Sequence, residues 1–97
     1  MNVIDTKNAP GAIGPYSQAY EVNGVIYTSG QIPVNPADGT VADGIAAQAE
    51  QSCKNVGAIL EAAGSGFDRV FKTTCFLADM GDFAAFNEVY EIGRAHV

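Results

Sequence analysis

The sequence predicts one small domain that contains both strands and helices, and two observations carry this prediction. A strong hairpin signal, Asn23-Gly24, separates two runs of β-forming residues. An amphipathic run over residues 45–63 then shows the 3.6-residue period of a helix. The predicted order along the chain is strand, strand, strand, helix, strand, helix. A chain of 97 residues with 47% hydrophobic content has room for one domain and for no second one.

Three strands are predicted in the N-terminal third of the chain. Val3-Ile4 begins a short edge strand. Ser17–Val22 and Val25–Ser29 flank the Asn23-Gly24 turn, because asparagine and glycine are the residues that adopt the positive φ angles of a tight hairpin. Prolines, Asn and Asp-Gly make residues 33–44 a connecting loop.

Ile45–Ala63 is predicted to be a helix with one apolar face. Gly44, or the aspartate before it, caps its start and Gly64 its end. Glu50 and Lys54 stand four residues apart, which favours an ion pair on the helix surface. At about 100° per residue, the apolar stripe consists of Ile45, Ala49, Ser52, Val56, Ile59, Leu60 and Ala63, and the opposite face of Glu50, Gln51, Lys54 and Glu61.

Val70–Leu77 is predicted to be a strand, since it is rich in β-branched and aromatic residues. Asp79 or Asp82 then caps a second helix that runs to about Glu91.

An amide interrupts the apolar face of this second helix. Phe83, Phe86 and Tyr90 point to one side, and Asn87 points there too. A buried amide costs stability unless it is hydrogen-bonded. Asn87 therefore either bonds to a neighbouring loop, which the residues alone favour, or borders a pocket.

Charge and motifs exclude several classes of protein. A formal net charge of −6 argues against nucleic acid or an anionic membrane as partner. No apolar run approaches the roughly 20 residues that span a bilayer, and the N-terminus has no secretory signal. We interpret Cys53 and Cys75 as small buried residues in a reducing cytoplasm, a disulfide being the weaker alternative. With no CxxC, no HExxH, no P-loop and one histidine, His96, next to the end, the sequence predicts neither a metal site nor a catalytic triad.

Two segments place small polar groups at a predicted strand end. They are Ile13–Gln18 and Tyr27–Pro33. Gly30 allows a ligand to approach the backbone closely, or a positive φ, and the proline after it stops the strand. By default, Tyr16 packs with its hydroxyl tethered to the backbone, and Ser29 bonds to local backbone. Together these groups favour the binding of a small polar molecule.

The segments IGPYSQA and YTSGQIPVNP, taken with Asn87, resemble the Rid family (RidA/YjgF, reactive intermediate imine/enamine deaminases) over residues 6–90. The resemblance implies an α+β, chorismate-mutase-like fold, a mixed sheet backed by two helices, and homotrimers with clefts between subunits. It implies hydrolysis of enamine or imine acids, such as 2-aminoacrylate and 2-iminopropanoate, to 2-keto acids and ammonia, with no cofactor. The substrate-binding positions that it implies are Tyr16, Ser29, Gly30 and Asn87.

The chain departs from the family pattern after Tyr90. The family adds a Pro-Ala-Arg-Ser-like segment, whose arginine binds the substrate carboxylate, a late glutamate that helps to activate water, and two strands. Arg94 does not stand in that motif and receives no role. We therefore expect an incomplete domain over residues 1–97, with C-terminal strands missing and a tail at 92–97 that is foreign to the family.

Three functions stay open at this point. The first is a cytoplasmic imine/enamine deaminase that is catalytic in its intact form. The second is a binding or interaction module on the same scaffold, and for the 97 residues alone we expect this one, without deaminase activity. The third is the family's ribonuclease assignment, which a chain with only five Lys and Arg residues disfavours.

Overall fold

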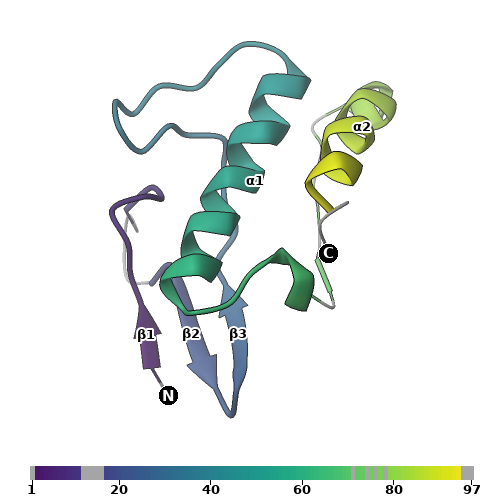
Figure 1. Cartoon of the computed structure of the whole chain (residues 1–97). Helices are drawn as coiled ribbons and strands as arrows, with labels where there is room; N and C mark the ends of the chain where they lie inside the picture. Colours follow the sequence, from purple (N-terminus) through teal and green to yellow (C-terminus); the bar gives the residue numbers. More distant parts are fainter. Residues whose placement is uncertain are drawn as a thin grey trace.

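A computed structural model describes residues 2–11, 17–70, 72–73, 75, 77 and 79–94 (Figure 1). Strands β1 (Asn2–Ile4), β2 (Ala19–Val22) and β3 (Val25–Thr28) form an antiparallel sheet in the order β1-β2-β3. Helix α1 (Ile45–Ala62) lies across one face of the sheet, and α2 (Phe83–Arg94) packs beside α1. Two short 3₁₀ helices, η1 (Phe67–Arg69) and η2 (Met80–Asp82), lie between α1 and α2 along the chain. The arrangement confirms the α+β class.

The hairpin between β2 and β3 forms where the sequence predicts it. Asn23 and Gly24 have φ angles of 52° and 81°, which is the backbone of a two-residue turn that matches the twist of its strands. The register pairs Val22 with Val25 beside the turn and Ala19 with Thr28 at the far end. β1 adds to β2 as the predicted edge strand.

Alternation along the three strands divides the sheet into two faces. One face meets α1 around Ile59, which is fully buried and packs with Ala19 and Ala9. On the other face Val3 and Tyr27 are 60% and 59% exposed. We call this second face the outer sheet face; by its register and alternation it comprises Val3, Tyr20, Val22, Val25 and Tyr27.

Helix α1 matches its prediction to within one residue, and its C-terminus shows why. The N–H of Gly64 donates to Glu61 O at 3.0 Å, and the N–H of Ser65 donates to Leu60 O at 2.8 Å. This pair of bonds is a Schellman motif, and Gly64 supplies the positive φ of 78° that it needs. At the other end Gly44 is the cap, with no side-chain bond, so the aspartate before it does not cap the helix.

Helix α2 begins through Asp79, whose Oδ1 accepts from the N–H of Gly81 at 2.8 Å and so caps η2. The helix ends at Arg94, beyond the predicted end at about residue 91. Phe86 and Tyr90 stack with ring centroids 5.5 Å apart. Phe83 is 52% exposed, because the first residue of a helix has covering neighbours on one side only.

The predicted strand at Val70–Leu77 is not present in its described residues. Residues 70, 72, 73, 75 and 77 pair with no strand, and the other residues of the segment lie outside the described ones. A strand exists only where a neighbouring backbone pairs with it, and the described sheet ends at β1 and β3. All pairs in that sheet are antiparallel, so the parallel pairing of a mixed sheet is not seen among these residues.

The cysteines differ from their interpretation as buried residues. Cys75 is exposed and Cys53 is half-buried, and both are free. Cys75 is exposed because the segment that carries it is not part of the described sheet. Burial, with a smaller contribution from Cys75, raises the pKa of the Cys53 thiol, which disfavours the thiolate that nucleophilic chemistry needs.

Candidate functional site

Ser29 follows β3 and is hydrogen-bonded to the backbone of Gln18, the residue before β2. Its N–H and its Oγ both donate to Gln18 O, at 2.9 and 3.1 Å. The amide of Gln31 donates to the Oγ and the carbonyl oxygen of Ser29, at 3.3 and 3.4 Å. The local hydrogen bonds that serine makes by default are therefore present. They also fix the hydroxyl at a rigid strand end, where a ligand can meet it in one orientation.

Gly30 is the next residue and is exposed. Its φ is not among the positive ones, so that reason for a glycine is wrong here. A Cβ added to it would meet nothing within 4 Å, which means that the space above this backbone is open. Among the described residues, no group accepts a hydrogen bond from the Gly30 N–H. The position therefore offers a free donor beside the Ser29 hydroxyl.

Gln18 is the residue of this region that sequence reasoning missed. It is 2% exposed, and its Oε1 accepts from the N–H of Thr6 at 2.6 Å. Its Nε2 donates to the carbonyl oxygens of Thr6, Ala9 and Pro10 at 3.0, 3.3 and 2.8 Å. The side chain thus ties the loop after β1 to the start of β2, while its own carbonyl holds Ser29. Its presence in the IGPYSQA segment was the only signal.

Of the two other predicted site residues, the structure describes Asn87 alone. Tyr16 lies outside the described residues. Asn87 is half-buried on α2, which packs on α1, and it takes part in an interaction of its own. Neither of the two described cavities is lined by Ser29, Gly30 or Asn87. One chain therefore places the serine and glycine at the end of the sheet and the asparagine in the helical layer.

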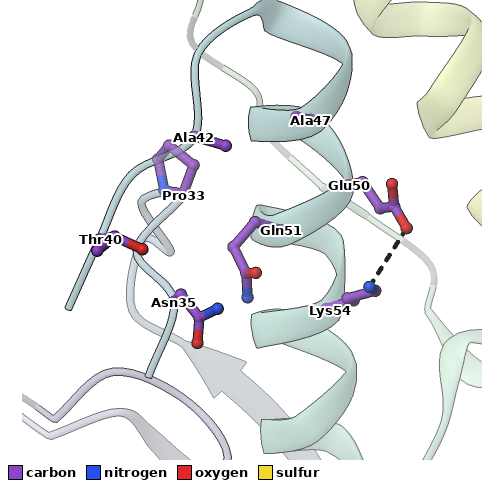
Figure 2. A pocket seen from close by; sticks show the side chains of 8 residues that line it. All are labelled: Pro33, Asn35, Thr40, Ala42, Ala47, Glu50, Gln51 and Lys54. Carbon is purple, nitrogen blue, oxygen red and sulfur yellow. Dashed lines mark ion pairs between the residues drawn. The ribbon is translucent and has the colours of Figure 1, made fainter. Parts of the chain in front are cut away.

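A cavity of about 190 Å³ lies between α1 and the loop over residues 33–42 (Figure 2). Gln51 extends from α1 toward Asn35 of the loop. The predicted pair of Glu50 and Lys54 forms on its rim at 3.3 Å, with both side chains exposed. Such an exposed pair adds little stability, and the cavity carries no net charge. Its walls are Pro33, Asn35, Thr40, Ala42, Ala47, Glu50, Gln51 and Lys54.

The described residues contain no group of three or more His, Cys, Asp or Glu placed to hold a metal ion. One acid near the cavity serves a turn instead: hydrogen bonds from the side chain and the backbone of Thr40 lower the pKa of Asp38. In the part of the chain that is described, no helix has the length and apolarity that crossing a bilayer requires.

Comparison with known proteins identifies the family. The family described as Endoribonuclease L-PSP matches residues 6–95. The chain belongs to this family, that of the Rid proteins. The predicted family membership is therefore confirmed.

Rid relatives match closely in sequence and in structure. The 2-iminobutanoate/2-iminopropanoate deaminase of Salmonella typhimurium is 52% identical over 91% of this chain and 69% of its own length. The human protein of the same name is 54% identical over 92% of this chain and 66% of its own length. The crystal structure of Escherichia coli TdcF with bound serine has a TM-score of 0.96 at 43% identity, and covers 99% of this chain and 76% of that one. The Rid fold is thus shown.

Proposed function

We propose that this Rid protein hydrolyses reactive 2-imino and 2-enamino acids, such as 2-iminopropanoate, to 2-keto acids and ammonia. The observation that carries the proposal is the free Gly30 N–H beside the fixed Ser29 hydroxyl at the end of β3. Identities of 52% and 54% to two proteins named as deaminases for such substrates support it.

The chemistry asks for positioning more than for a strong nucleophile. The imine carbon is already electrophilic, so water adds to it and gives a carbinolamine. A proton then moves to the nitrogen, the C–N bond breaks, and ammonia leaves a 2-keto acid. The Gly30 N–H would donate to a substrate oxygen, and the Ser29 hydroxyl would orient the substrate or the attacking water.

Two further parts of the site are proposed to come from elsewhere. A substrate carboxylate needs a cation, best an arginine. We assign that role to the C-terminal part of the relatives, which lies outside the region that matches this chain. We also propose a homotrimer, in which a neighbouring copy brings Asn87 toward Ser29, and we keep Tyr16 as a proposed substrate-binding residue. Exposure of Val3 and Tyr27 on the outer sheet face supports such an assembly.

An ammonia assay tests the proposed activity. A β-eliminating enzyme generates 2-aminoacrylate, and ammonia release is followed with this chain and with the chain extended to full length by the C-terminal sequence of the Salmonella relative. We expect the extended protein to accelerate release and the 97 residues alone to leave it unchanged, because the carboxylate-binding cation is missing. A folded extended protein that gives no acceleration over buffer would reject the deaminase in favour of a binding module.

Ribonuclease activity is the second candidate, because the family's description names an endoribonuclease. A net charge of −6 gives an RNA backbone little to bind. We therefore expect RNA incubated with the same extended protein to remain intact, as judged by gel electrophoresis.

Both free cysteines are consistent with the cytoplasmic location that we propose.

Gly30→Ala separates the proposed ligand contact from folding. The new Cβ would point into open space at an ordinary φ, so the melting temperature should stay within about 2 °C of the parent. The same methyl group would stand where a ligand approaches the N–H, and the rate of ammonia release should fall by about tenfold or more. Gly11→Ala, which also meets no atom within 4 Å, is the control and should change neither. Full activity in Gly30→Ala would show that no ligand approaches this backbone.

A further inference from the structure

One side chain of α1 reaches the segment that follows the candidate site. Asn55 is fully buried. Its Nδ2 donates to the carbonyl oxygens of Ile32 and Val34, at 3.1 and 2.9 Å. Its Oδ1 accepts from Nε2 of Gln51 at 2.9 Å, which fixes which end of the amide faces the loop. Both donors and the acceptor of this buried amide are therefore used.

The two carbonyl oxygens that Asn55 binds stand on either side of Pro33. The N–H of Val34 donates to Ile32 O at 2.8 Å, which closes a γ-turn around the proline. The short segment from Ser29 to Val34 is thus held at both ends, by Gln18 O from the sheet side and by Asn55 from the helix side. Gly30, with its free N–H, lies between these two anchors.

We infer that Asn55 is a positioning residue for the ligand-binding end of β3, acting through Ile32–Val34 on the backbone of Gly30. The inference rests on the proposed function, because it gives Gly30 a ligand. An apolar residue at position 55 would fill the same space but leave the Val34 carbonyl oxygen without its Asn55 donor and the Ile32 carbonyl oxygen with the Val34 N–H alone. Such groups cost free energy until they reach water, so the segment would move outward and carry Gly30 with it.

Substitutions at two other residues of α1 distinguish a positioning role of Asn55 from a general loss of stability. Gln48 makes a similar bond from α1 to the far end of the same loop, with its Nε2 2.9 Å from Ala42 O, but this bond is exposed. Ile59 is as fully buried on α1 as Asn55, yet it packs with Ala9 and Ala19 instead of the loop. Gln48→Ala therefore controls for a loop anchor, and Ile59→Val for a loss of core stability.

The experiment uses the extended protein and two readouts for each variant. Hydrogen exchange reports the opening of residues 30–35, and an NMR titration of the Gly30 amide with 2-oxobutanoate, a stable 2-keto acid, reports binding. Asn55→Leu should speed exchange in 30–35 and weaken 2-oxobutanoate binding by about tenfold or more. Gln51→Ala, which leaves the asparagine in place without its orienting bond, should weaken binding by about threefold. Gln48→Ala and Ile59→Val should change binding by less than about twofold.

Each outcome decides the inference. Asn55→Leu that binds 2-oxobutanoate as tightly as the parent overturns it, and so does Ile59→Val that weakens binding as much as Asn55→Leu. If Asn55→Leu does not fold, unchanged binding in Gln51→Ala overturns it instead. A parent that neither binds 2-oxobutanoate nor turns over 2-aminoacrylate overturns the proposed function. In that case hydrogen exchange in residues 30–35 alone decides the inference about Asn55. The inference fails if Asn55→Leu leaves this exchange unchanged. Where Asn55→Leu does not fold, it fails if Gln51→Ala leaves the exchange unchanged.

Discussion

Gln18→Leu is expected to lower the free energy of unfolding by about 3–5 kcal/mol. The leucine would fill the buried space but would leave four backbone groups without their hydrogen bonds to Gln18. These groups are the N–H and carbonyl of Thr6 and the carbonyls of Ala9 and Pro10. Each such group that stays away from water costs about 1–3 kcal/mol. Because a small domain is stable by only about 5–15 kcal/mol, this one change would bring the chain close to unfolding.

Urea denaturation followed by circular dichroism measures this effect. Gln48→Leu is the matched control, because it removes one exposed amide bond and should cost no more than about 1 kcal/mol. If Gln18→Leu proves as stable as Gln48→Leu, the loop over residues 6–10 finds other partners, and Gln18 does not hold it.

Local signals predicted the hairpin and the first helix well. Asn23-Gly24 adopts the positive φ angles that its residue types favour, and Gly64 ends α1 with the same kind of backbone. These choices depend on residues a few positions apart, so the sequence displays them directly. The predicted strand over 70–77 failed in its described residues for the opposite reason, since pairing depends on a partner far away in the chain.

The two buried amides show the same limit at the level of side chains. Gln18 binds groups 8 to 12 residues away, and Asn55 binds carbonyl oxygens 21 and 23 residues away. Neither has a sequence pattern, because any polar residue beside an apolar stripe can equally be solvated. Burial and distance distinguish them only once the chain is folded.

The sequence predicted where Ser29 and Gly30 lie, because their motif is compact. Ser29 and Gly30 lie together at a strand end, as expected, and their local bonds explain the residue types. Asn87 sits half-buried on α2, whose main contact is with α1. The sequence spacing within one chain does not indicate that Asn87 lies near Ser29. Its place beside the substrate therefore stays a prediction that depends on the assembly of several copies of the chain.

Ser29→Ala is expected to reduce ammonia release from 2-aminoacrylate by about 100-fold in the extended protein. The hydroxyl is a side-chain group at the end of β3 that hydrogen bonds fix next to the Gly30 N–H, for which no acceptor is found among the described residues. Its loss should cost little stability, about 1 kcal/mol or less. Gln18 O keeps the N–H of Ser29 as its donor at 2.9 Å, so no buried carbonyl is left without a partner.

The comparison of rate with stability makes this prediction decisive. Thr28→Ala removes the hydroxyl of the preceding, exposed residue and should leave the rate of ammonia release within about twofold of the parent. If Ser29→Ala keeps the parental rate, the hydroxyl serves only its local hydrogen bonds with Gln18 and Gln31, and the catalytic water is oriented by another group. If it loses rate and stability in proportion, its role is to hold the strand end. A large loss of rate with an unchanged melting temperature is the result that places Ser29 against the substrate.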